Sequence, residues 1–348
     1  MSDKSKRYNI FRNQLKYSGG SELKGLQIIK LICAFLVVQS HIRFGAHEIL
    51  LPICRVGVPI FLMISGYFLL DGEGYISMNK ISKSFFKILK IYIFASCVYF
   101  VYQILFIILK GQSLSEFYCN IAYWLRYFFV GDSTSIHLWY LVSILQVYLL
   151  ILLLLPLYNR IKSFKILYLI ISIGLLFNFL FGKYNFLIDF LPNNLLLSRN
   201  VFTIGLPCVF IGTFIRCYEN RLPSTRIVLS FLVLFITLLY IENDFLENKT
   251  ESLLGDLNFF TLPCAICIMI LSLRINYDNK LSNLLASYGK KYSLDIYIWH
   301  LLVYGPIIFL VKQLDMPSIS LIVVILVIIL TLIISSTFQK IGIKNLYT

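Results

Sequence analysis

The stretch that decides the fold is Leu26-Gln-Ile-Ile-Lys-Leu-Ile-Cys-Ala-Phe-Leu-Val-Val-Gln-Ser-His-Ile-Arg-Phe44. It is long enough and apolar enough to cross a membrane as one helix, because about 20 residues span the hydrocarbon layer. Two titratable side chains, Lys30 and His41, interrupt it. Such a group at membrane depth costs ~2.5 kcal/mol or more, so each of the two marks a candidate functional site.

The rest of the chain has the same apolar character. Of its 348 residues, 59% are hydrophobic and 14% are charged, which is far too apolar for a soluble domain of this size. We therefore expect an all-α integral membrane protein with about ten transmembrane helices. The apolar stretches that predict them cover residues 26–44, 52–70, 86–109, 136–156, 164–181, 200–215, 227–241, 258–273, 292–311 and 318–338.

The distribution of charge predicts an orientation. If both termini are cytosolic, the cytosolic segments hold 22 of the 31 Lys and Arg residues. This excess is the positive-inside asymmetry of an oriented membrane protein. It accounts for the net charge of +14 without a nucleic acid partner. We predict a multi-pass protein of the plasma membrane.

One membrane domain is expected, between two short tails. Residues 1–25 and 339–348 form cytosolic tails and residues 26–338 form the domain, since no repeat or low-complexity linker divides it. The first tail is polar and basic, unlike a cleavable signal peptide. Cys264 and Cys267 form a CxxC pair inside a predicted helix with no second pair, so we interpret them as packing residues and expect no metal site.

Lys30 and His41 are predicted to share one face of the first helix. They are eleven residues apart, which returns to nearly the same face about 16 Å further along the axis. That separation excludes a directly paired dyad and favours a polar path, with a cation near its cytosolic end and a base near its outer end. In the alternative, Lys30 extends to the lipid headgroups and His41 hydrogen-bonds a neighbouring helix.

Further cations lie near both ends of such a path. Arg43, His47 and Arg55 surround the expected outer turn, where positive charge would hold an oxyanion or an acidic substrate. On the cytosolic side, four lysines at helical spacing form a basic stripe that suits either anionic lipid headgroups or an anionic donor. These lysines are Lys80, Lys83, Lys87 and Lys90.

Other polar and helix-weakening residues lie inside the predicted spans. Pro59 and the pair Ser65-Gly66 loosen helical hydrogen bonding, which membranes tolerate where helices pack closely or line a cavity. His137 opens the fourth span and His300 lies in the ninth. Alone, His300 is interpreted as a packing histidine; beside His41 it becomes a candidate lining residue.

Four of these segments together resemble the acyltransferase-3 family of membrane acyltransferases. The resemblance covers nearly the whole chain and implies ten or more helices. It implies transfer of an acyl group, most often acetyl, from cytosolic acyl-CoA to a hydroxyl of an extracytoplasmic glycan. The segments are Ile29–His41, Arg55–Tyr67, Leu138–Leu141 and Ser293–His300.

The resemblance also implies roles for single residues. His41 matches the essential histidine of the family, and Lys30 stands where the family usually has arginine, which keeps the charge but loses the bidentate fork. Within the second and third motifs, the matching residues that we take as binding candidates are Arg55, Ser65, Tyr67 and Trp139.

Acyl transfer from a thioester to an alcohol needs a base that works near neutral pH. Histidine is the side chain closest to that requirement, so the hypothesis assigns His41 as the general base. An acyl-histidine intermediate is the alternative route. Lys30, with Lys83 and Lys87 of the stripe, would orient the CoA phosphates, and Arg43 or Arg55 would stabilise negative charge on the outer side.

The expected partners are membrane lipid, acyl-CoA as the donor substrate and a glycan acceptor, with no bound cofactor and no nucleic acid. A transporter or flippase of a glycan-related or small solute is the alternative function, because ten helices with buried charges also describe solute carriers. The sequence shows no two-half repeat that would favour it.

Overall fold

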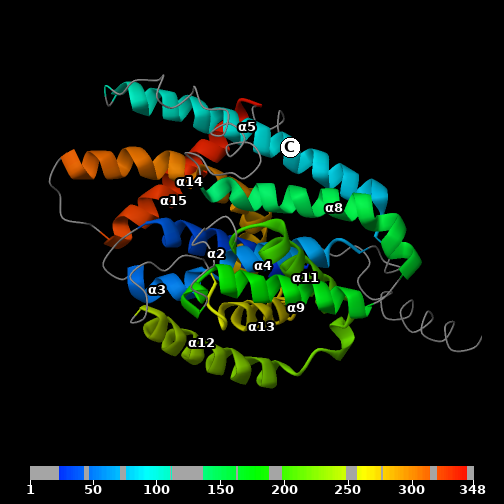
Figure 1. The fold of residues 1–348 in the computed structure, drawn as a ribbon. Coiled ribbons are helices and arrows are strands. Elements are labelled where there is room, and N and C mark those ends of the chain that lie inside the picture. Colours follow the sequence, from blue (N-terminus) through cyan, green and yellow to red (C-terminus); the bar gives the residue numbers. More distant parts are fainter. Residues whose placement is uncertain are drawn as a thin grey trace, which may run out of the picture.

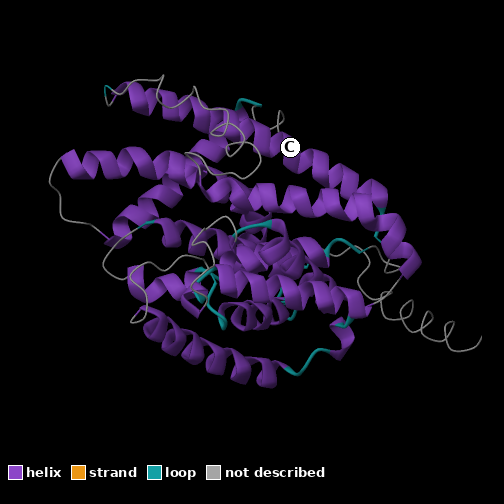
Figure 2. Ribbon diagram, viewed as in Figure 1, coloured by secondary structure: helices purple, strands orange, loops and turns teal. Residues whose placement is uncertain are grey.

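The computed structural model describes residues 23–42, 47–70, 76–109, 111, 136–161, 164–187, 198–247, 257–275, 277–313 and 320–342. Their regular structure is helical, apart from one isolated bridge between Leu70 and Ile76, which confirms the all-α prediction for these residues (Figure 2). Five helical segments in this part of the chain are long and apolar enough to cross a membrane, and shorter apolar helices accompany them. The total number of crossings and the side of the termini stay predictions.

Helices occupy all ten of the apolar ranges. Four short turns join the longer helices, namely η1 (Ile136–Leu138), η2 (Asn185–Leu187), η3 (Val201–Gly205) and η4 (Glu219–Arg221). The longer helices are α2 (Lys24–His41), α3 (His47–Cys54), α4 (Gly57–Tyr67), α5 (Met78–Leu109), α8 (Trp139–Ile161), α9 (Phe164–Phe181), α11 (Leu206–Cys217), α12 (Thr225–Glu247), α13 (Thr261–Ser272), α14 (Lys280–Gln313) and α15 (Ser320–Lys340).

The helices form one bundle in which α2, α4, α11 and α13 lie near the centre and α5 and α12 lie at opposite edges (Figure 1). The most extensive contacts join α2 to α14 and α4 to α11, helices that are far apart in the sequence. The edge helices expose apolar side chains, such as Val233 of α12 at 66%. Apolar exposure of this kind suits a surface that faces lipid.

Small residues allow α4 and α11 to approach closely. A Cβ atom on Gly66 would overlap the backbone carbonyl of Val209, and one on Gly212 would overlap that of Met63. The Thr213 hydroxyl then donates to the Gly66 carbonyl across the contact, at 3.2 Å. Close packing through small residues and interhelical hydrogen bonds is how membrane helices associate. The close approach at Gly66 therefore follows the packing predicted for the Ser65-Gly66 pair.

The second apolar range is two helices, α3 and α4, with a tight turn at Arg55–Val56 between them. Arg55 therefore lies in the turn between two helices of one apolar segment, and the outer turn expected after the first helix includes residues 43–46, which are outside the described part of the chain. The break between α3 and α4 agrees with the loosening proposed at Pro59, because the proline has no N–H to donate to the Arg55 carbonyl and its ring would clash with that carbonyl in a continuous helix.

Helices α5 and α14 begin earlier than predicted, at Met78 and Lys280 instead of residues 86 and 292. Hydropathy marks only the apolar part of a helix, and polar turns continue the same hydrogen-bonding pattern beyond it. The four stripe lysines accordingly lie on α5 and are exposed.

Contacts between neighbouring helix ends occur at two ends of the bundle. At the end predicted to be cytosolic, the Lys24 ammonium hydrogen-bonds the Asp278 carboxylate at 2.8 Å, which lowers the pKa of Asp278. At the opposite end, Glu242 of α12 accepts from the Phe260 backbone N–H at 3.0 Å and from the Tyr184 hydroxyl. The start of α2 therefore lies beside the segment before α14, and the end of α12 lies beside the start of α13.

Candidate functional site

Two cavities lie inside the bundle and share one wall residue, Tyr297 of α14. The larger has a volume of about 360 Å³, and we call it the lysine cavity. The smaller has a volume of about 40 Å³, and we call it the histidine cavity. No carboxylate occurs among the described residues that line either one.

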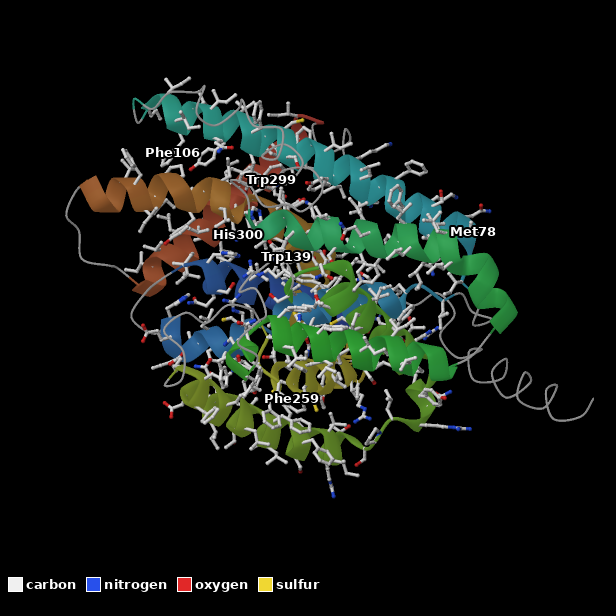
Figure 3. All side chains as sticks on the ribbon, in the orientation of Figure 1. Met78, Phe106, Trp139, Phe259, Trp299 and His300 are labelled. Atoms are coloured by element: carbon white, nitrogen blue, oxygen red, sulfur yellow. The ribbon has the colours of Figure 1, made fainter. Side chains whose placement is uncertain are left out.

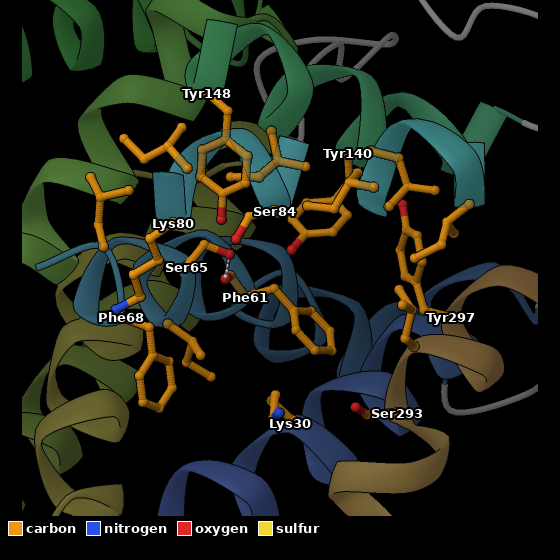
Figure 4. Close-up of a pocket in the computed structure, with 18 of the residues that line it drawn as sticks. Lys30, Phe61, Ser65, Phe68, Lys80, Ser84, Tyr140, Tyr148, Ser293 and Tyr297 are labelled. Atoms are coloured by element: carbon orange, nitrogen blue, oxygen red, sulfur yellow. Dashed lines mark hydrogen bonds between the residues drawn. The ribbon is translucent and has the colours of Figure 1, made fainter. Parts of the chain in front are cut away.

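Three lysines from three helices line the lysine cavity. Lys30 comes from α2, Lys80 from α5 and Lys290 from α14. Figure 4 shows the hydroxyl ends of Tyr140 and Tyr148 pointing into the same space. The polar lining residues are Lys30, Ser65, Lys80, Ser84, Tyr140, Tyr148, Lys290, Ser293 and Tyr297. This composition suits an anionic ligand that also carries hydrogen-bonding groups.

Ser65 lines the lysine cavity from α4. Its hydroxyl donates to the Phe61 carbonyl one turn earlier, at 3.0 Å, as serines in membrane helices commonly do. The rings of Phe61, Tyr140 and Tyr297 pack together, with centroid distances between 5.3 Å and 6.3 Å. These three rings all line the lysine cavity, at the end where Tyr297 also borders the histidine cavity.

Two arginines and two histidines line the histidine cavity. His41 enters from the end of α2, Arg55 from the turn between α3 and α4, and His137 from η1. The Arg199 guanidinium lies over the Trp139 indole ring, 5.7 Å from its centroid. Positive charge beside a histidine suits chemistry in which negative charge develops, such as attack on a carbonyl group.

The position of Arg199 is fixed by the start of the next helical turn. Asn200 caps η3: its side chain accepts from the backbone N–H groups of Phe202 and Thr203, and the Thr203 hydroxyl accepts from the Asn200 N–H. η3 is a π turn, a rare conformation found often at functional sites.

Three histidines from three segments pack together at this end of the bundle. The ring centroids of His41 and His300 are 5.2 Å apart, those of His137 and His300 are 5.0 Å apart, and those of His41 and His137 are 6.4 Å apart. His137 and His300 are buried, and Figure 3 labels His300 and Trp139 in the interior of the bundle. The packing brings together segments about 260 residues apart in the sequence.

His137 is held in place from two sides by α14. Its Nε2–H donates to the Ile298 carbonyl at 2.9 Å, and its own carbonyl accepts from the Tyr297 hydroxyl. The Tyr99 hydroxyl donates to the same Ile298 carbonyl at 2.6 Å and accepts from the Leu302 N–H at 3.2 Å. A rigid setting of this kind holds catalytic groups in fixed positions.

The structure divides the residues that the sequence proposed for the site. Lys30 and Ser65 line the lysine cavity; His41, Arg55 and Trp139 line the histidine cavity. His300 packs against His41. Arg43 lies outside the described residues. Two stripe lysines proposed for the site, Lys83 and Lys87, are exposed on α5 and are not among the lining residues, whereas Lys80 is.

Tyr67 lies away from both cavities, in a cluster between α4 and the end of α11. Its hydroxyl donates to Glu219 at 2.7 Å and accepts from Arg216 at 2.9 Å. Arg216 also pairs with Glu219 at 2.8 Å. The helical rotation from Ser65 to Tyr67 is about 200°, so the two side chains lie on opposite sides of α4. This contact indicates a packing role for Tyr67.

The lining residues that sequence reasoning did not propose for the site include His137, Arg199, Lys290 and Tyr297. The cost of a titratable group at membrane depth, which marks His41, applies equally to His137, and it is the one sequence feature that could have identified His137. Arg199 and Lys290 precede predicted spans and were counted as loop charges. Nothing in the sequence pattern marks Tyr297 as the residue shared by the two cavities.

Comparison with known proteins identifies a family for the chain. Residues 23–339 match the profile of the Acyl_transf_3 family, described as an acyltransferase domain. A protein of Enterococcus faecalis named as an amino-acid racemase is 28% identical over 309 residues, which cover 80% of this chain. The match spans only 40% of that protein's length. No solved structure gives a significant match.

The family match covers nearly the whole chain, including the described helices from α2 to the last turn of α15. It agrees with the resemblance carried by the motifs around His41, Arg55, Trp139 and His300. The chain therefore belongs to the acyltransferase-3 family.

Proposed function

We propose that this protein transfers a short acyl group, acetyl first among them, from cytosolic acyl-CoA to a hydroxyl of a glycan outside the plasma membrane. One observation carries the proposal: a cavity with three lysines and a cavity with His41 and two arginines meet at Tyr297. The first suits the phosphates of the donor. The second suits proton removal and the negative charge that follows.

The donor would lie in the lysine cavity. Ammonium groups bind phosphates as mobile point charges, so Lys30, Lys80 and Lys290 suit a flexible nucleotide end better than a rigid fork would. The hydroxyls of Ser65 and Tyr148 offer hydrogen-bond partners to the amides of the pantetheine arm. The thioester would then lie near Tyr297, within reach of the histidine cavity.

The reaction would take place beside His41. His41 removes the proton of the acceptor hydroxyl, and the oxygen attacks the thioester carbonyl to form a tetrahedral oxyanion. Arg55 and Arg199 stabilise that oxyanion by charge. When it collapses, the C–S bond breaks, the ester stays on the glycan and the CoA thiolate takes the proton back from His41. No metal or redox partner is needed to balance these steps.

The racemase relative does not change this proposal. The aligned part is 40% of that protein, so the part outside the alignment is long enough to hold the activity that its name states. A membrane domain joined to amino-acid chemistry does, however, make solute transport the second candidate function. Two cavities that meet at one residue, with charges in both, would also suit a transport path.

Inside-out vesicles that contain extracted surface glycan separate the two functions. With labelled acetyl-CoA outside, we expect label on the enclosed glycan, and His41→Ala should lower its rate roughly 10²- to 10⁴-fold because a positioned base contributes that much. His47→Ala is the matched control, since His47 contacts the Ile42 carbonyl and is not a lining residue of either cavity. Solute uptake that needs no acyl-CoA, with no label on glycan, would reject acyl transfer.

A further inference from the structure

The histidine cavity has an apolar wall to which the proposed reaction assigns no role. Among the groups that meet at the reacting carbonyl, the acyl chain is the apolar one, because the acceptor is a hydroxyl and the base is an imidazole. Apolar groups are more stable beside one another than in water, so this wall suits the acyl chain. In the described part of the chain, the wall consists of Val37, Cys54, Val58, Pro59, Ile204 and Leu257.

The volume of the histidine cavity limits the length of that chain. It is about 40 Å³, whereas one water molecule occupies about 30 Å³ of the liquid. A methyl group is about as large as a water molecule. The cavity therefore has room for the methyl group of an acetyl whose carbonyl lies near Tyr297, and each further CH₂ would need the wall to yield. The lysine cavity, at about 360 Å³, imposes no such limit.

Ile204 is a part of this wall that is fixed in place. It is 1% exposed and lies in η3, the capped π turn. The Ile204 N–H donates to the Asn200 carbonyl at 3.2 Å, and the Thr203 hydroxyl donates to the Ser198 carbonyl at 2.9 Å. These bonds tie the turn to the residues on either side of Arg199, which lines the same cavity.

Close packing around η3 leaves the turn little room to move. Gly205 directly follows Ile204, and a Cβ atom on it would lie 2.7 Å from the Ser143 hydroxyl oxygen and 2.9 Å from a methyl carbon of Val147, both on α8. The turn also contacts α9 and α11. A packed interior does not take up an extra methylene without strain, so a longer acyl chain would meet a wall that is held on three sides.

We propose that Ile204 sets the length of the acyl chain: its side chain closes the apolar part of the histidine cavity, so that acetyl fits and propionyl or a longer chain does not. The inference rests on the proposed function, because it places the acyl group in this cavity during transfer. Ile204 forms no bond in the reaction and acts only by excluding volume. One CH₂ in a hydrophobic pocket changes kcat/KM about 10- to 200-fold. We expect the unmodified protein to prefer acetyl-CoA over propionyl-CoA by a factor in that range.

Variants that shorten Ile204 in steps test the proposal. Ile204→Val removes one carbon atom from the wall, and Ile204→Ala removes three. Relative to acetyl-CoA, we expect Ile204→Val to raise kcat/KM for propionyl-CoA about tenfold and Ile204→Ala to do the same for butyryl-CoA. Initial rates on extracted surface glycan, with each donor in turn, measure these ratios. Equal use of the three donors by the unmodified protein, or unchanged ratios in both variants, overturns the proposal.

Val201→Ala is the matched control for disturbance of η3. Val201 is buried in the same turn and is not a lining residue of either cavity. We expect this variant to lower thermal stability and to leave the ratios between the three donors unchanged. A shift in those ratios as large as that of Ile204→Ala would assign the effect to a loosened turn and overturn the proposal.

The binding of unreactive donors separates this inference from the proposed function. Thioethers of CoA that carry an ethyl, propyl or butyl group match the three donors in chain length and have no acyl group to transfer. By isothermal titration calorimetry, we expect the unmodified protein to bind the ethyl thioether at least tenfold more tightly than the butyl thioether, and Ile204→Ala to remove most of that difference. Equal binding, no binding, or a difference that survives Ile204→Ala overturns the inference. Length-dependent binding without acyl transfer rejects the proposed function instead.

Discussion

The lysine cavity and the histidine cavity share Tyr297 but are built in different ways. The first is about 360 Å³ and is lined by flexible lysines, two of which, Lys80 and Lys290, are exposed. The second is about 40 Å³ and is lined by planar side chains, among them Arg199 and Trp139. Room and mobile charge suit the binding of a large donor, whereas a small and rigid space suits a transition state.

The segments that carry the lining side chains of the histidine cavity are also held by hydrogen bonds. The His137 ring bonds the Ile298 carbonyl and the His137 carbonyl accepts from Tyr297, while Asn200, next to Arg199, caps η3. Preorganised donors and charges of this kind stabilise developing charge without reorganisation during the reaction. The comparison teaches that substitutions in the two cavities should change different kinetic constants.

The largest effect is expected in the histidine cavity. Arg55→Gln or Arg199→Gln removes charge beside the oxyanion, so kcat should fall about 10²-fold while KM for acetyl-CoA stays near its original value. Steady-state kinetics on purified protein in lipid nanodiscs measures both constants. Arg226→Gln is the control, because Arg226 is exposed on α12. A rise in KM with kcat unchanged would break the division between the cavities.

A smaller effect, on the other constant, is expected in the lysine cavity. The double variant Lys30→Gln with Lys290→Gln should raise KM for acetyl-CoA about tenfold, because Lys30 is half-buried and Lys290 is exposed, and each such charge pair with phosphate is worth on the order of 1 kcal/mol or less after screening. The shift should shrink as salt is added. Lys83→Gln, which alters an exposed lysine of the same basic surface, should leave KM unchanged. If it raises KM as much as the double variant, the stripe and not the cavity binds the donor.

The sequence predicted the helices well and their contacts only in part. Apolar runs mark a helix regardless of its neighbours. The spacing of Lys30 and His41 follows from α2 alone and excludes a direct pair, and the two residues line different cavities. The contact of His41 with His300 depends instead on how α2 packs on α14. No pattern within one helix carries that information.

The errors have the same origin. Tyr67 stands two residues from Ser65 in one motif, yet the rotation of α4 turns it toward Arg216. Arg199 and Lys290 fall just before the apolar ranges 200–215 and 292–311, because hydropathy begins a span at its first apolar residue, whereas both side chains line a cavity. Side chains of Arg and Lys are long enough to do so from a helix end.

A substitution outside both cavities tests whether the packing of α4 on α11 affects activity. Gly66→Ala places a Cβ against the Val209 carbonyl, a backbone atom that cannot move aside, so α4 and α11 must separate. We expect a loss of ~1–3 kcal/mol in stability, seen as a lower melting temperature, because overpacking in a tight core costs about that much. KM should rise more than kcat falls, since the neighbouring Ser65 lines the lysine cavity.

Gly305→Ala is the matched control for that change. There the added Cβ meets only the end of the Tyr102 side chain, which can swing away. We expect a smaller loss of stability and unchanged kinetics. Equal destabilisation by the two variants would mean that the contact of α4 with α11 is no tighter than that of α14 with α5.

The smallest effect is expected at Asp278, a charge outside both cavities. The hydrogen bond from Lys24 lowers the pKa of Asp278, so the bond favours folding above the ordinary pKa of an aspartate, about 4, and this contribution is lost as the pH falls through the lowered value. Asp278→Asn should therefore match the unmodified protein at low pH and melt slightly earlier at neutral pH. Because the pair is exposed to solvent, added salt should erase the difference. Both kinetic constants should stay unchanged near neutral pH, and a change in either would extend the donor site beyond the lysine cavity to the ends of α2 and α14.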